Sequence, residues 1–335
     1  MARLEYFIRR LLLMIPTFLG ITLACFAICQ FVPGGPVEQM VLRMRGTGGG
    51  ETGAGGTGRS VAIGPEQIEA IRKHFGFDQP LAMRYCNWLV RDRMGMAAPS
   101  YKYPNKTSLQ IILDRLPVSL IFGLTGFFLT YLVCIPLGIA KALRHDSAFD
   151  LASSVLVFIG YAIPAFALGM VLKMLLCGTV EWGFDIFPIA GFKSDNFDTL
   201  TFGGKVADIA RHMALPVVCY MIGGFAVLTL LMKNSLIEEV SKDYARTARA
   251  KGCSPRRVVW GHVLRNSLIP IATGFGDVLL AILAGSVLIE QVFEIPGMGK
   301  LSLEAIVSRD YQIFMGIVAL TAVLGMLARL LSDFC

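Results

Sequence analysis

The chain has 335 residues, of which 55% are hydrophobic and only 16% are charged, and its mean hydropathy is +0.62. This apolar share is well above that of a soluble domain, and several apolar runs reach the ~20 residues that cross a bilayer, so an ordinary soluble globular protein is excluded. The formal net charge of +7 would suit nucleic acid, but the basic residues gather beside the apolar runs, which favours orientation in a membrane and excludes nucleic acid as the expected partner.

The first predicted membrane span covers Leu11 to Val32 and follows three arginines, so its N-terminus is expected in the cytoplasm. The run is too long for the apolar region of a cleaved signal peptide, and no small-x-small cleavage site follows it. We assign residues 1–32 to the N-terminus and this span.

A polar segment, residues 33–115, follows and is expected to form a folded extracytoplasmic insert. Residues 46–60, rich in Gly and Thr, read as a flexible linker within it. The stretch Gly53–Ser60 matches a phosphate-binding loop with Arg in place of Lys. Since no strand precedes it and its expected side of the membrane holds no ATP, we prefer the linker interpretation.

The rest of the insert predicts two helices. One covers Gly64–Gly76, and the second, amphipathic, covers Pro80–Gly95. The second helix carries Tyr85 and Trp88, which are expected at the membrane interface. The insert is therefore predicted to be ordered outside its linker.

Five further spans are predicted at residues 116–140, 151–177, 213–232, 268–292 and 311–331. Pro164, in the third predicted span, allows a kink. The loops after spans two and four are basic and those after spans three and five are acidic, so the positive-inside rule places both termini in the cytoplasm. These patterns predict an all-α integral membrane protein with six transmembrane helices and a core at residues 116–335.

The basic loop 233–267 predicts a helix, a tight turn and a second helix. The first helix runs from Asp243 to Gly252, because glycine tolerates the left-handed conformation that ends helices. Ser254 then caps a new helix with Pro255 at its first position. The first helix is polar and basic, and its alanines are expected to let a partner outside the bilayer approach closely.

Ionisable residues within predicted spans are costly and indicate a cavity or a partner. Asp277, in the fifth span, either lines a translocation path or hydrogen-bonds a neighbouring helix; Lys173, in the third, either lines the path or snorkels from near the span's end. Glu290 is a further path candidate. Gly274–Asp277 matches the Gly-x-Gly-Asp element of intramembrane aspartyl proteases, but that chemistry needs a second aspartate, and no other span contains one.

Cysteine and histidine usage indicates neither a disulfide framework nor a metal site. The chain has eight cysteines but no CxxC pair, and its four histidines are scattered along the sequence. We therefore expect the cysteines to be small packing residues and expect no bound metal.

The stretch Asp243–Gly252, read with Leu264–Pro270, resembles the coupling motif of ATP-binding-cassette importer permeases of the dipeptide/oligopeptide branch. The Glu-Ala-Ala positions of that motif look like Arg246, Thr247 and Ala248, so the glutamate is absent, as in many members of the peptide branch. Gly252 matches the glycine of the motif.

Further stretches carry the same resemblance. Glu290–Lys300 looks like the family's E-x-V-F-x-I-P-G-x-G segment, Arg309–Tyr311 looks like the R-D-Y before its last span, and Asn87–Leu89 with Arg115–Pro117 match more weakly. Within the branch the chain resembles the Yej-type importers. Its Gly-rich linker departs from the general family and is expected to mark a subgroup. The family usually continues past its last span with a short tail that contains Asp-Pro-Arg, and the sequence stops at Asp333–Cys335, before such a tail.

The resemblance implies a type I importer permease, without catalytic residues, that moves oligopeptides and peptide-like compounds across a bacterial inner membrane. It implies as partners a second homologous permease forming a heterodimer, an ATPase with two nucleotide-binding domains, a periplasmic peptide-binding protein and membrane lipid. ATP and Mg would be bound by the ATPase, and no cofactor by this chain. The residues implied to couple to the ATPase are Asp243, Tyr244, Arg246, Thr247, Ala248, Arg249, Lys251 and Gly252.

Two other classes remain as alternatives. An ion-coupled secondary peptide transporter would use Asp277 and Lys173 at mid-membrane, but no internal repeat is evident and the basic loop 233–267 is poorly explained. A structural membrane scaffold would leave the matched motifs unexplained. Dependence on an ATPase partner separates these alternatives from the importer.

Overall fold

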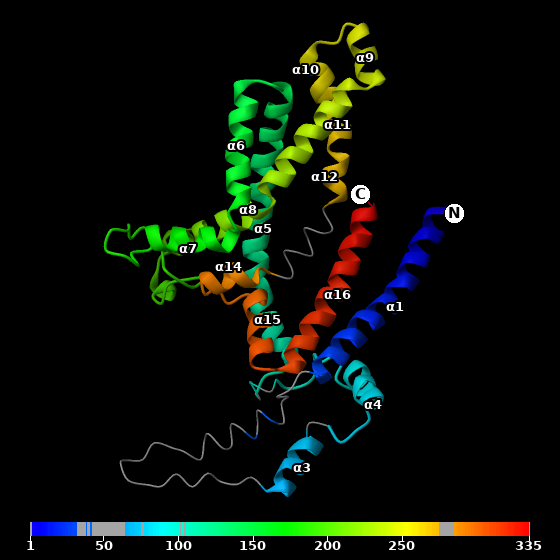
Figure 1. Ribbon diagram of the computed structural model, residues 1–335, viewed down its shortest axis with the longest axis vertical. Helices are drawn as coiled ribbons and strands as arrows, with labels where there is room; N and C mark the ends of the chain where they lie inside the picture. The colour runs from blue at the N-terminus through cyan, green and yellow to red at the C-terminus, as the bar shows by residue number, and fades with distance from the viewer. Residues whose placement is uncertain are drawn as a thin grey trace. The chain divides into compact units, whose positions relative to one another are not determined.

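The computed structural model describes residues 2–31, 38, 41, 64–74, 77–100, 102–103, 105–274 and 285–334 (Figure 1). All regular structure in these residues is helical. Extended pairing among them is limited to two isolated bridges, Pro99 with Thr107 and Cys177 with Asp185. The predicted all-α class is therefore confirmed.

Four of the described helices are long and apolar enough to cross a membrane. They are α1 (Ala2–Phe31), α5 (Ser108–Leu143), α8 (Phe202–Ser241) and α16 (Tyr311–Phe334). The shorter helices are α3 (Pro65–His74), α4 (Leu81–Cys86), α6 (Ala148–Ala162), α7 (Ala165–Leu176), a 3-10 turn (Phe197–Thr199), α9 (Asp243–Ala250), α10 (Pro255–Val258), α11 (Leu264–Ser267), α12 (Ile269–Thr273), α14 (Val287–Val292) and α15 (Met298–Val307).

The third predicted span is broken by a sharp bend between α6 and α7. The two helices meet at 91°, and the pair counts as a fifth span only if it is one broken crossing. The break has a local cause, since the residue before a proline is pushed out of the helical region. Ile163 accordingly takes an extended backbone with φ −90° and ψ 120° before Pro164.

The fifth predicted span is described only at its two ends, by α11 and α12 on one side and α14 on the other. Asp277 lies outside the described residues, as does the linker 46–60. Of the protease-like motif Gly274–Asp277, the structure describes only Gly274. The count of six helices therefore stays a prediction.

The chain divides into two compact units, residues 1–114 with 302–323 and residues 115–301 with 324–335. In the first unit the helix predicted at Pro80–Gly95 is shorter, consisting of α4 and a π-helical turn at Asn87–Arg91. Trp88 is only 4% exposed and packs with Phe26 and Met315. A long-range contact therefore buries the indole against protein, and its place at the membrane interface stays a prediction.

Hydrogen bonds to Asp310 join the last part of the insert to the start of α16 within the same unit. Its carboxylate accepts hydrogen bonds from Ser100 Oγ at 2.5 Å and from the Lys102 backbone N at 3.1 Å. It also accepts from the Ile313 backbone N at 3.3 Å, which makes it the N-cap of α16. The side chain is fully buried. The aspartate of the Arg-Asp-Tyr stretch therefore has a structural role.

Replacing Asp310 by Ala should lower the thermal unfolding temperature of the detergent-solubilised protein. The change removes a helix cap, worth about 1 kcal/mol, and leaves buried donors unpaired at about 1–3 kcal/mol. The control is Asp198→Ala, because that side chain is 87% exposed. Equal shifts for the two variants would contradict the assigned role of Asp310.

Candidate functional site

Helix α9, in the second unit, begins and ends where local sequence signals place its ends. Gly252 has a φ of +81°. Its backbone N–H donates to Arg249 O at 2.9 Å, and the Cys253 N–H donates to Ala248 O at 3.2 Å. This pair of bonds is a Schellman motif, in which a left-handed residue satisfies the last helix carbonyls.

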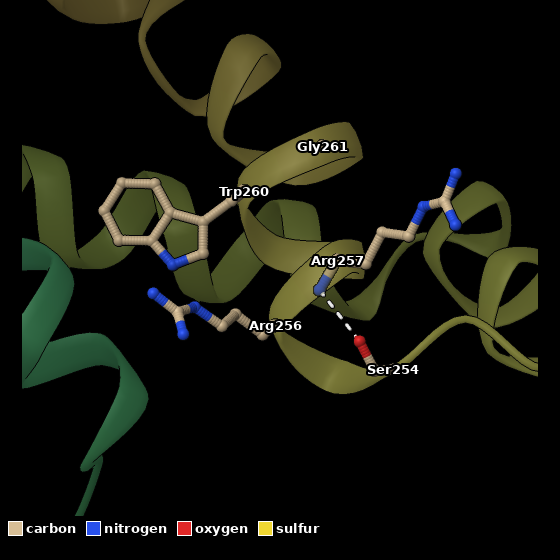
Figure 2. Close-up of a pocket in the computed structure, with 5 residues that line it drawn as sticks. All are labelled: Ser254, Arg256, Arg257, Trp260 and Gly261. Carbon is tan, nitrogen blue, oxygen red and sulfur yellow. Dashed lines mark hydrogen bonds between the residues drawn. The ribbon is translucent and has the colours of Figure 1, made fainter.

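The second helix of the loop starts directly after this turn. Ser254 is its N-cap, and the side-chain oxygen accepts from the Arg257 backbone N at 3.4 Å (Figure 2). Pro255 occupies the first turn, as predicted. Helix α10 continues through a π-helical turn at Val259–Val263 into α11. The predicted order of helix, turn and helix is confirmed.

Two of the three alanines of α9 face the protein's own core. Ala245 is fully buried and Ala248 is 9% exposed. They pack in one cluster with Met232 and Leu236 of α8 and with Val263. Ala250 is exposed and the coupling role of Ala248 stays a prediction, but Ala245 and Ala248 are enclosed by the protein itself. Their small size lets α9 lie close to its neighbouring helices.

The polar face of α9 is exposed. The side chains of Asp243 and Arg246 are 97% and 69% exposed, and their 3.7 Å ion pair is a surface contact of little energetic weight. Thr247, Lys251 and Gly252 are also exposed. This set, which we call the outward face of α9, is what the loop offers to a partner.

Two further residues expected to couple to the ATPase also form hydrogen bonds that hold α9 to α8. The Tyr244 hydroxyl donates to Glu239 at 2.5 Å, and partial burial together with this bond raises the pKa of Tyr244 above its usual value, so it remains a donor at neutral pH. Arg249 is exposed, and its guanidinium donates to the Val240 carbonyl at 3.0 Å. Both contacts hold α9 at a set angle to α8.

A shallow cavity of about 660 Å³ lies beside α10 and is lined by Ser254, Arg256, Arg257, Trp260 and Gly261 (Figure 2). Trp260 is 56% exposed. Neither of the two guanidinium groups forms an ion pair within the described residues. The cavity therefore continues the basic character of the loop. Trp260 was not singled out from the sequence, although its spacing of four residues from Arg256 places both on one helix face.

Glu290, a predicted path residue, lies in a buried cluster instead of on an open surface. It is 1% exposed. Its carboxylate accepts from Ser119 Oγ at 2.9 Å and from the Lys300 backbone N at 2.8 Å. Ser119 Oγ in turn accepts from the Met298 backbone N at 2.7 Å. The loop after α14 thus wraps around the carboxylate and satisfies it.

The glycines of the Pro-Gly-Met-Gly stretch make this wrapping possible. A Cβ at Gly297 would lie 2.5 Å from both Glu290 Cδ and Ser119 Oγ. A Cβ at Gly299 would lie 2.6 Å from the Val287 backbone N. Both distances are impossible for real atoms, so the resemblance in Glu290–Lys300 reflects a packing requirement.

Lys173 also finds a partner within its own unit. Its ammonium donates to the Val292 carbonyl at 2.9 Å, and Val292 is the last residue of α14. A cation at this place satisfies a free carbonyl and complements the negative end of the helix. The structure therefore ties α7 to α14 through Lys173, whereas Asp277 lies outside the described residues.

Comparison with known proteins adds the family. Residues 134–335 match the model for "Binding-protein-dependent transport system inner membrane component". The peptidoglycan transport system permease protein YejB of Agrobacterium fabrum is 39% identical over 98% of this chain and 94% of its own length. The inner membrane ABC transporter permease protein YejB of Escherichia coli O157:H7 is 40% identical over 98% and 95%. The dipeptide transport system permease protein DppB of E. coli K12 is 32% identical over 98% and 96%.

Replacing Gly299 by Ala should lower the thermal unfolding temperature of the purified protein. The added methyl meets backbone, which cannot move aside cheaply, and overpacking of this kind costs about 1–3 kcal/mol. Gly223→Ala is the matched control, because nothing lies within 4 Å of the position that its added methyl would take and alanine favours the interior of α8. A Gly299→Ala protein as stable as the Gly223→Ala protein would refute the packing argument.

Proposed function

The chain belongs to the family of binding-protein-dependent transport system inner membrane components, and we propose that it is a membrane-spanning permease subunit of an ATP-binding-cassette importer. The substrates would be oligopeptides and peptide-like compounds, because the similar proteins carry peptidoglycan, dipeptide and oligopeptide transport in their names. The resemblance to peptide-branch permeases, and to the Yej type within them, is borne out by these relatives.

The loop that holds α9 is the observation on which the mechanism rests. Its outward face is polar and exposed, while its alanine face and Tyr244 fix it to α8. Such a helix is held rigidly and still offers side chains to a partner. We propose that the ATPase binds this face, so that movement of its nucleotide-binding domains is passed to α8.

Charge complementarity supports the same assignment. Arg246 and Lys251 on the outward face and Arg256 and Arg257 beside the cavity make this surface basic. A basic surface favours an acidic partner and speeds its association. The ATPase surface that meets α9 would accordingly carry carboxylates.

The remaining assembly follows from the family. We propose six transmembrane helices with both termini in the cytoplasm, a heterodimer with a second permease, and delivery of peptide by a periplasmic binding protein. ATP and Mg would be held by the ATPase, and this chain would supply no catalytic group. Asp277 remains our candidate for the path. No observation favours the ion-coupled alternative.

The direct test is isolation of the tagged protein from detergent-solubilised membranes, followed by an ATPase assay. We expect a second permease and an ATPase in stoichiometric amounts, with activity stimulated by a peptide-loaded binding protein. A protein that purifies without an ATPase and moves peptide in response to a proton gradient would overturn the proposal.

Thr247→Trp should reduce peptide uptake without unfolding the protein. Thr247 is exposed, and its hydroxyl bonds only the Asp243 carbonyl of its own helix, at 2.9 Å, among the described contacts. A bulky ring there obstructs docking, and we expect a drop of about ten-fold, equivalent to about 1.4 kcal/mol. Gly252 is a poorer position for this test because its φ of +81° strains any other residue.

Asp198→Trp is the control for this experiment, since it adds the same ring at an exposed site in the polar segment of the same unit. Uptake and copurifying ATPase are measured for both variants, together with the unfolding temperature. Normal uptake by Thr247→Trp would count against docking at the outward face.

A further inference from the structure

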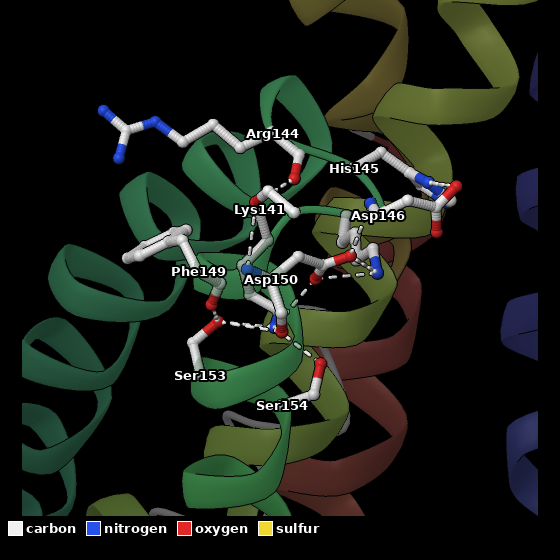
Figure 3. A network of polar contacts seen from close by, with 10 residues as sticks. Lys141, Arg144, His145, Asp146, Phe149, Asp150, Ser153 and Ser154 are labelled. Carbon is white, nitrogen blue, oxygen red and sulfur yellow. Dashed lines mark hydrogen bonds and ion pairs between the residues drawn. The ribbon is translucent and has the colours of Figure 1, made fainter.

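Two buried charged side chains and a third that is mostly buried meet where α5, α6 and α8 pack together in the second unit. The side chain of Lys141 is fully buried, that of Asp150 is 7% exposed and that of Lys233 is 14% exposed. Figure 3 shows Lys141 and Asp150 directed toward each other, with Ser153 and Ser154 beside them. None of these residues belongs to the stretches that carry the family resemblance.

Lys141 is satisfied by α6 alone. Its ammonium donates to Asp150 O at 2.9 Å and to the hydroxyl oxygens of Ser153 and Ser154, each at 2.8 Å. It also lies 3.1 Å from the Asp150 carboxylate. The turn 144–147 already connects α5 to α6 through the backbone, so this contact adds no new link between helices.

Lys233 makes the link that the backbone does not make. Its ammonium donates to both carboxylate oxygens of Asp150, at 2.9 and 2.7 Å. These two bonds join α8 to α6, whose helices also pack against each other. Two short charge-assisted hydrogen bonds in a mostly buried place resist slipping of α8 against α6.

A cation site is a weaker interpretation of the same place. Ligand atoms of His145, Asp146 and Asp150 lie within 4.8 Å of one another. Both oxygens of Asp150 are already occupied by ammonium groups, and two lysines oppose the approach of a further positive charge. The cluster therefore serves contact between helices.

The position of Lys233 along α8 gives this contact a consequence. Helix α8 runs unbroken from Phe202 to Ser241, and α9 follows after Lys242. Tyr244 and Arg249 hold α9 to the end of α8. A displacement of α9 is therefore passed to Lys233 through continuous helix and from there to Asp150.

We propose that the Lys233–Asp150 pair transmits movement of α9 into the α6–α7 bend, and that Lys233 is a positioning residue for coupling ATP hydrolysis to transport. The inference rests on the proposed function. It adds a residue outside the loop that contacts the ATPase. Packed helices usually switch between two discrete arrangements and do not deform gradually. A contact between two helices transmits movement through such a switch.

Lys233→Met tests this without stranding a charge, because Asp150 remains paired with Lys141. Lys141→Met is the matched control: it removes an equally charged and more deeply buried lysine from the same cluster but leaves the α6–α8 pair. Lys233→Arg keeps the charge and should retain part of the coupling between ATP hydrolysis and peptide uptake that Lys233→Met loses. Each variant is reconstituted as the full complex in liposomes, and peptide uptake and ATP hydrolysis are measured together.

We expect Lys233→Met to lower the peptide transported per ATP by about two- to thirty-fold, with ATP hydrolysis continuing, and Lys141→Met to stay near wild type. Equal losses in the two variants would overturn the inference and leave a structural cluster only. Wild-type coupling in Lys233→Met would also overturn it. Failure of the wild-type complex to couple ATP to peptide would instead contradict the proposed function.

Discussion

A charged side chain that leaves water must be met by partners, and three such groups organise the described helices. Glu290 is wrapped by the loop that follows it, Asp310 caps α16, and Asp150 holds two lysines. A buried carboxylate without these contacts would cost several kcal/mol, so each one fixes the backbone around it. Two of the three lie in the stretches that resemble the importer family.

Part of the fold was predictable from the sequence because it depends on residues that are close together in the chain. The ends of α9 depend on residues next to each other, a glycine that tolerates positive φ and a Ser-Pro pair that starts the next helix. The long apolar helices follow from composition alone. Local rules also predict the break at Pro164, although the angle of 91° between α6 and α7 depends on what each half packs against.

The rest depends on contacts between residues far apart in the chain. Ser119 and Glu290 are 171 positions apart, and Ser100 and Asp310 are 210 apart. No periodicity reveals such pairs. Sequence reasoning consequently did not predict that tertiary packing buries both Glu290 and Trp88. It also assigned the alanines of α9 to a partner, because small residues suit close packing on either side.

The two faces of α9 consist of different residues, one set packed against the protein's own core and one set exposed. Alanine packing and the bond from Tyr244 determine how the helix sits on its own protein, whereas Asp243, Arg246, Thr247 and Lys251 have no part in that core. If the ATPase binds the outward face as proposed, partner choice and folding depend on different side chains of one short helix. Under that proposal, a duplicated gene would acquire a different ATPase by changing a few exposed positions, while the helices that carry them stay intact.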